Sequence, residues 1–147
     1  MTLHDPITVR RVIDDDGASI AELMKQLGYP KSPSPCEARL KRLALSCSEL
    51  VLVAERTSEI VGALGIHLRS LLHKGVYMGR ITALVVREDI RGQGIGKSLV
   101  QEAERWAWAK DYTRLEVTSG DHRRRAHKFY ESVGFRCDER RFLKVKS

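Results

Sequence analysis

The chain has 147 residues, of which 42% are hydrophobic and 31% are charged, and its formal net charge is +7. This length and balance are typical of one soluble globular domain with a substantial core, taken here as residues 1–147. No apolar run approaches the length of a membrane span. The N-terminal residues lack the apolar stretch of a signal peptide, so we expect a cytoplasmic protein with no membrane partner.

The positive charge is concentrated in the second half of the chain. Residues 1–79 carry ten Lys and Arg against nine Asp and Glu, whereas residues 80–147 carry sixteen against ten. An anionic ligand accounts for this excess, and so would nucleic acid or a merely solubilising surface. The three cysteines and five histidines have no metal-binding or disulfide spacing, so we expect no metal.

The first third of the chain predicts one strand and two helices. Residues 7–13 (ITVRRVI) have the alternation of a strand. Three aspartates at positions 14–16 supply N-cap candidates for a helix with apolar residues at 20, 23, 24 and 27, which ends at Gly28. The sequence Ser34-Pro35-Cys36-Glu37 is a capping box with proline at the first helical position, so a second helix is expected to begin there.

The middle of the chain predicts three strands. Residues 50–55 and 59–68 read as an antiparallel hairpin, in which Gly62 and Gly65 indicate a bulge or a crowded neighbour. A third strand covers residues 76–86. Its period-two pattern places positions 81, 83 and 85 on one face and positions 82, 84 and 86 on the other.

A glycine-rich turn, Arg91-Gly92-Gln93-Gly94-Ile95-Gly96-Lys97, follows that strand and opens a helix with apolar residues at 95, 99, 100, 103, 106 and 107. Three glycines in five residues permit positive φ and a close approach of the backbone to a ligand. The free N–H groups and positive dipole end of the helix favour an anion, best a phosphate. The spacing is one residue short of a P-loop and does not fit the dinucleotide-binding fingerprint.

The last part of the chain predicts a strand at residues 113–118 and a helix from about residue 123 to 133, stopped by Gly134. Two closing strands are expected at residues 135–137 and 141–146. The element order is then β-α-α-β-β-β-α-β-α-β-β, which gives an α/β fold class with a mixed sheet covered by helices.

Two motifs together resemble those of the GNAT N-acetyltransferase superfamily. Arg91, Gly94 and Gly96 fill the pattern Arg/Gln-x-x-Gly-x-Gly/Ala directly after a strand. Residues 126–135 read Ala-x-x-Phe-Tyr-x-x-x-Gly-Phe, at the distance and in the order of the second coenzyme A motif of that family. The element order is similar to the GNAT fold over residues 7–145.

The resemblance implies acetyl-CoA as cosubstrate and a set of residues that would bind it. The main chain at the end of the central strand would meet the pantetheine arm as an added strand does, through Leu84, Val85 and Val86. The glycine turn would wrap the pyrophosphate through Arg91, Gly92, Gln93, Gly94, Ile95, Gly96 and Lys97. Many members carry Asn where this chain has Arg123. Arg123, Arg124 or Arg125 could instead meet the 3′-phosphate, or this run could be a solvated basic helix start.

For the chemistry, Tyr130 is the predicted acid, because a phenol is protonated at neutral pH and can donate to a departing thiolate. A backbone N–H near Val85 would polarise the carbonyl. Glu116 is the best-placed carboxylate for a general base, but it also fits a surface residue. Asp121, His122 or a water relay are the alternatives.

The favoured interpretation is therefore an N-acetyltransferase that moves the acetyl group of acetyl-CoA directly to a primary amine of a small molecule. A protein or peptide amine acetyltransferase and a non-catalytic CoA-binding module are the alternatives. Nucleic acid is a disfavoured partner, because the basic run at residues 123–125 has no interleaved aromatic residues. A homodimer is expected, since exposed strands of this fold often pair.

Overall fold

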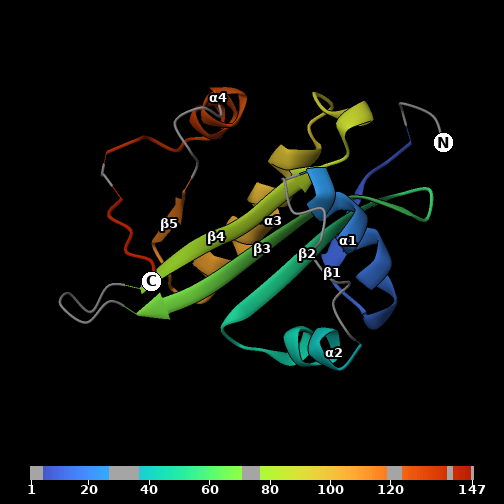
Figure 1. The fold of residues 1–147 in the computed structure, drawn as a ribbon, viewed down its shortest axis with the longest axis horizontal. Helices are drawn as coiled ribbons and strands as arrows, with labels where there is room; N and C mark the ends of the chain where they lie inside the picture. Colours follow the sequence, from blue (N-terminus) through green and yellow to red (C-terminus); the bar gives the residue numbers. More distant parts are fainter. Residues whose placement is uncertain (1–4, 27–36, 71–76, 119–123, 139–140, 147) are drawn as a thin grey trace.

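The computed structural model describes residues 5–26, 37–70, 77–118, 124–138 and 141–146 (Figure 1). Five strands form one sheet in the order β1-β2-β3-β4-β5. The first three pairings are antiparallel, and β4 pairs with β5 in parallel. The elements are β1 (Thr8–Arg11), η1 (Asp14–Asp16), α1 (Gly17–Gln26), α2 (Glu37–Leu45), β2 (Glu49–Arg56), β3 (Glu59–Ser70), β4 (Tyr77–Val86), η2 (Glu88–Ile90), α3 (Ile95–Ala109), β5 (Arg114–Val117) and α4 (Arg124–Ser132).

Helices cover both faces of the sheet, so the mixed α/β fold is confirmed (Figure 1). Helix α3 connects the parallel strands β4 and β5, as parallel pairing requires. It packs on one face of the sheet in a core that includes Leu52, Leu64 and Leu99. On the opposite face α1 and α2 pack in a second core that includes Leu23, Leu40 and Val53. Within the described residues, no helix is both long and apolar enough to cross a membrane.

A bulge in β4 changes the expected pattern of the central strand. The register passes from Ile66 opposite Ile81 to Gly65 opposite Ala83, which leaves Thr82 as the extra residue. An extra residue reverses the side-chain alternation beyond it. Ile81 accordingly packs in the α3 core, whereas Val85 packs in the α1 and α2 core. The prediction that positions 81, 83 and 85 share one face is therefore wrong.

The two strand glycines explain how such close packing is possible. A Cβ at Gly65 would lie 2.9 Å from Oγ1 of Thr82, so the missing side chain gives the bulged threonine its space. A Cβ at Gly62 would lie 3.1 Å from Leu99 of α3. The expectation of a bulge or a crowded neighbour at these glycines is confirmed, since both features are present.

The two closing strands are not observed. Residues 135–138 and 141–146 are irregular, and in the described part of the chain β5 is the last strand of the sheet. Three apolar side chains of the second segment are exposed, at 94, 68 and 75% for Phe142, Leu143 and Val145. Alternating residues show what a strand could bury, but a strand also needs a hydrogen-bonding edge. That edge is not specified by the local sequence.

The start of the first helix depends on a buried ion pair. Asp16 is 5% exposed and receives two hydrogen bonds from the Arg10 guanidinium, at 2.9 and 3.0 Å, while its Oδ2 accepts the Ile13 backbone N–H at 2.8 Å. Arg10 also donates to Glu55 of β2 at 2.9 Å. Burial raises the pKa of Asp16, but the hydrogen bonds from Arg10 and Ile13 outweigh it, and the pKa lies below its usual value. The aspartates thus begin a 3-10 turn, and α1 follows from Gly17.

We predict that Asp16→Asn lowers the free energy of unfolding at pH 7 by roughly 2 kcal/mol, because Arg10 loses a buried partner. The pKa of Asp16 is about 4 in the unfolded protein and lower in the folded one, so the ionised carboxylate stabilises the fold fully above pH 4. This stabilisation is lost as the pH falls through the pKa of the folded state. Denaturant unfolding at pH 7 and below pH 4 should therefore show a difference that shrinks in acid. Asp15→Asn, at an exposed position, is the control and should leave stability within about 0.5 kcal/mol. A difference that is independent of pH would contradict this account.

Candidate functional site

The sheet opens where β4 and β5 separate. Their parallel ladder begins at Met78 and Arg114 and ends at Ile81 and Val117. Figure 1 shows β4 continuing beyond the end of β5. In the described part of the chain, residues 82–86 pair only with β3, so their other edge faces the opening. An extended ligand can add to such an edge as an extra strand.

The predicted pantetheine-binding residues lie on this stretch of β4. Leu84 and Val86 are partly buried against the α3 core, while Val85 is buried on the opposite face. The main-chain groups on the unpaired edge of these residues are the part that an added strand would use. The carbonyl of Val86 already accepts a hydrogen bond from Nε of Arg91 at 3.1 Å. This bond ties the glycine turn to the end of the strand.

The glycine turn has the backbone that its sequence predicts. Gly92 and Gly94 both have φ of 82°, in the left-handed region that favours glycine. A Cβ at either position would meet nothing within 4 Å, so conformation and not space requires glycine there. Gly94 is the N-cap of α3 and supplies no capping side chain, and the first helical turn holds no acidic residue. An uncapped helix start with exposed backbone of this kind suits an anion.

The side chains of the turn divide between the surface and the core. Arg91, Gln93 and Lys97 are exposed, whereas Ile95 is 2% exposed and belongs to the α3 core. Ile95 can contribute only its backbone to a ligand. Gln93 accepts a hydrogen bond at 2.8 Å from Arg56, a buried residue of β2 that the sequence analysis did not identify. Nothing in the local sequence around Arg56 marks it as a contact of the turn.

Gly96 serves a different purpose from Gly92 and Gly94. A Cβ on Gly96 would lie 3.0 Å from the Phe129 ring, so this glycine allows α4 to pack against the start of α3. Tyr130 follows on α4, half-buried, with its ring 5.4 Å from that of Phe129 and 5.6 Å from that of Phe135. The two family motifs thus meet in space, and the predicted acid is held at their junction by aromatic packing.

Glu116 lies in a cluster of charged residues on the face of the sheet opposite α3. Its Oε1 accepts hydrogen bonds from Arg69 at 2.7 Å and from Arg80 at 3.0 Å, and Arg80 also donates to Oγ1 of Thr118 at 2.8 Å. Glu116 and Arg80 are about one third exposed. Arg80 and Glu116 lie opposite each other, one residue before the last pair of the β4–β5 ladder. Two guanidinium groups therefore compete with any substrate proton for the oxygen of the predicted base.

One predicted cofactor contact and two alternative bases lie in a part of the chain that the structure does not describe. Arg123, Asp121 and His122 lie outside the described residues. Among the residues that the structure does describe, no group of three or more His, Cys, Asp or Glu side chains could hold a metal ion.

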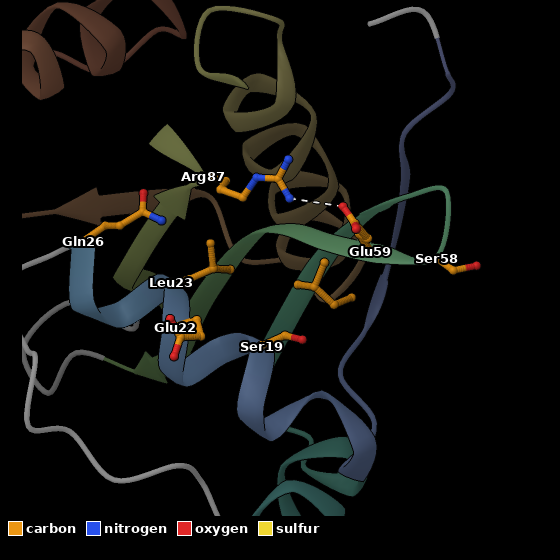
Figure 2. A pocket seen from close by; sticks show the side chains of 8 residues that line it. Ser19, Glu22, Leu23, Gln26, Ser58, Glu59 and Arg87 are labelled. Carbon is orange, nitrogen blue, oxygen red and sulfur yellow. Dashed lines mark hydrogen bonds and ion pairs between the residues drawn. The ribbon is translucent and has the colours of Figure 1, made fainter. Parts of the chain in front are cut away.

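A hollow of about 400 Å³ lies elsewhere, between α1 and the β2–β3 hairpin. Figure 2 shows Arg87 reaching to Glu59 across it, a contact of 3.2 Å, and Nε of Arg87 also lies 2.7 Å from Asp89. The hydrogen bonds that Arg87 donates to Asp89 and Glu59 raise its pKa, although desolvation lowers it. None of the predicted site residues lines this hollow, so it is not the site that the two motifs define.

Comparison with known proteins agrees with the geometry. The family model described as "Acetyltransferase (GNAT) family" matches residues 18–135. The chain belongs to this family of acetyltransferases, and the resemblance found from the two motifs is confirmed.

Among curated proteins, the chain is 36% identical over 93 residues to an aminoalkylphosphonate N-acetyltransferase of Salmonella typhimurium. The alignment covers 63% of this chain and 60% of that protein. The chain thus spans less than two thirds of this relative's length.

Two solved structures show the shared fold. A transcriptional regulator from Bacillus halodurans C-125 superposes with a TM-score of 0.83 at 24% identity, covering 97% of this chain and 100% of the other. AAC(6')-Iy, in complex with the bisubstrate analogue CoA-S-monomethyl-acetylneamine, has a TM-score of 0.83 at 18% identity, covering 97% and 99%.

We predict that Gly94→Ala weakens binding of coenzyme A at least tenfold, because a side chain at φ of 82° costs roughly 1–2 kcal/mol and displaces the N–H groups of the turn. Isothermal titration with coenzyme A measures this loss. Asp111→Val is the control for strain, since Asp111 also has positive φ and is exposed but follows α3, outside both motifs. It should destabilise the fold similarly and leave the affinity within about threefold. Equal losses of affinity in both variants would contradict the assignment.

Proposed function

We propose that this protein is an acetyl-CoA-dependent N-acetyltransferase that transfers the acetyl group directly to a primary amine of a small molecule. The observation that carries the proposal is the meeting of an open β4 edge with an uncapped, left-handed glycine turn at the start of α3. One extended ligand with a peptide-like arm and a diphosphate fits both features. Membership of the GNAT family supports the same ligand.

In this proposal the pantetheine arm lies along the main chain of residues 84–86 and the diphosphate lies in the turn of residues 91–97. The acetyl group then lies toward the Thr82 bulge, where β4 and β5 separate. A backbone N–H at this bulge would stabilise the developing oxyanion. Preorganised donors of this kind contribute roughly 3 kcal/mol in other acyl-transfer sites.

The reaction needs one bond formed, one broken and two proton transfers. The neutral amine nitrogen attacks the thioester carbonyl carbon, and the tetrahedral intermediate collapses with loss of the coenzyme thiolate. The attacking nitrogen loses a proton to a base or water, and the thiolate gains one from the hydroxyl of Tyr130, whose phenolate then regains a proton from solvent. The packing of Tyr130 against Phe129 and Phe135 supports this role, because it limits the positions of the phenol.

The structure gives Glu116 two partners that favour a role other than the predicted base. Arg69 and Arg80 both donate to its Oε1, so we propose that Glu116 orients these arginines while water removes the amine proton. The base role stays a prediction that mutagenesis can separate from this one.

We further propose that the acceptor is a small amine carrying a phosphonate or a similar anionic group. Arg69 and Arg80 bring two positive charges to one carboxylate at the edge of the opening. Planar guanidinium groups suit phosphonate oxygens. The Salmonella relative is an aminoalkylphosphonate N-acetyltransferase, which supports this class. A protein or peptide amine is the second candidate.

We also propose a cytoplasmic location and a homodimer. The exposure of Phe142, Leu143 and Val145 supports association of two copies, because such residues gain by burial.

The first test is thermal unfolding with and without acetyl-CoA. At a hundredfold excess over the dissociation constant, a bound ligand adds about 2.7 kcal/mol and should raise the midpoint by several degrees. Tyr130→Phe should keep this shift and lower kcat roughly a hundredfold, measured by thiol release with an acceptor amine. No shift for the wild type would reject the function, and full turnover of Tyr130→Phe would reject only the acid role.

The acceptor class is tested by comparing a short aminoalkylphosphonate, the matching amino alcohol and a peptide amine. Arg80→Met should raise KM for the aminoalkylphosphonate at least tenfold and leave KM for the amino alcohol unchanged, because only the first has an anion to hold. Arg136→Met, at an exposed arginine paired with Asp138, is the control for net charge and should change neither.

Glu116→Gln separates the two roles of the carboxylate in the same assay. Loss of an orienting group should raise KM for the aminoalkylphosphonate and keep the shape of the pH profile of kcat. A large fall in kcat with loss of its rise with pH would instead establish the base.

A further inference from the structure

Arg56 is an unusually buried charged residue. It is the last residue of β2 and only 4% exposed. Strand alternation places it on the same face as Leu50, Leu52 and Ala54, which pack in the α3 core. Thr57 and Ser58 follow with φ of 50° and 64°, a tight two-residue turn that fixes the backbone beside it. The guanidinium is therefore held beneath the start of α3.

The partners of this guanidinium do not neutralise its charge. Its Nη1 donates to the amide oxygen of Gln93 at 2.8 Å, and its buried Nε has no hydrogen-bond partner. In the described part of the chain, Arg56 forms no ion pair with a carboxylate. A buried charge is normally paired, because removing it from water is costly. Arg10, also partly buried, has both Asp16 and Glu55.

Gln93, which accepts this hydrogen bond, lies in the middle of the glycine turn. Gln93 stands between Gly92 and Gly94, whose backbones have no side chains to restrain them and no neighbours for a Cβ. Arg91 anchors the turn to Val86 on one side. The Arg56 bond anchors it from the sheet side, through a residue 37 positions earlier in the chain.

We propose that Arg56 is a positioning residue for the diphosphate of the cosubstrate. It holds Gln93, and thereby the N–H groups of the turn, in the bound geometry, and its uncompensated charge beneath the turn attracts the anion. The inference rests on the proposed function, because it assumes that coenzyme A binds in this turn. A neutral amide partner suits this role, since a carboxylate would cancel the charge and repel the phosphates.

The experiment compares ligands with and without the diphosphate. Isothermal titration measures the affinity of wild type and Arg56→Met for coenzyme A, dephospho-coenzyme A and pantetheine. Arg56→Met should weaken the first two by the same factor of ten or more and leave pantetheine within about twofold, because only the first two carry the diphosphate. With acetyl-CoA as donor, KM should rise by a similar factor while kcat at saturation is kept.

Further variants separate the contact from the charge. Arg56→Lys keeps the charge and should retain part of the affinity, whereas Gln93→Ala removes only the contact and should give a smaller loss. The double variant Arg56→Met, Gln93→Ala should lose affinity for coenzyme A by a smaller factor than the product of the two single-variant factors, since the two residues share one hydrogen bond. Arg105→Met, an exposed arginine on α3, removes the same formal charge and should change the affinity less than twofold.

The possible outcomes separate the positioning role of Arg56 from the proposed acetyl-CoA-dependent function. If wild type does not bind coenzyme A, both proposals fail. If wild type binds and a folded Arg56→Met retains full affinity, or loses pantetheine equally, only the positioning role is overturned. Should Arg56→Met not fold, Gln93→Ala, at an exposed position, and Arg56→Lys decide, and unchanged affinity in both overturns the proposal.

Discussion

The site depends on the point at which two parallel strands stop pairing. The ladder of β4 and β5 ends at Ile81 and Val117, and the next residue of β4, Thr82, is a bulge that Gly65 accommodates. Before the bulge, β4 places Arg80 beside Glu116 on the face of the sheet opposite α3. After the bulge, its side chains pack toward both cores and its outer main-chain edge is unpaired among the described residues. In the proposed function, one strand would thus present a polar side chain to the acceptor and backbone groups to the cosubstrate.

Four arginines in and beside the central strands have different surroundings, and this decides what they can do. Arg87 lies between Glu59 and Asp89, so most of its charge is compensated. Among the described residues, Arg69 and Arg80 share one carboxylate, and Arg56 has only the side-chain amide of Gln93. Among these four arginines, positive charge that carboxylates do not balance is therefore left at the β4 opening and beneath the glycine turn. Net charge alone, spread over a surface, would not give this distribution.

Local patterns predicted those parts of the site that are continuous in sequence. The left-handed glycines, the start of α3 and the Phe-Tyr helix follow from short-range rules, and the structure has all three. Gly65 indicated a bulge or a crowded neighbour, but the place of the bulge at Thr82 of β4 did not follow, because the sequence ITALVV fits both alternations. Neither did the surroundings of Glu116, whose arginine partners lie 47 and 36 residues earlier. The two closing strands failed for the same reason, since strand pairing is a long-range property.

The burial of Arg56 illustrates a conflict between stability and binding. An apolar residue at this position would remove an unpaired buried group and favour the folded state. It would also free a turn whose two left-handed glycines can adopt many conformations, and the ordering of that turn would then oppose binding. A buried arginine moves this ordering from the binding step to the folding step. The fold can tolerate it because the sheet beneath it has two packed cores, and the turn gains a geometry that its own residues cannot enforce.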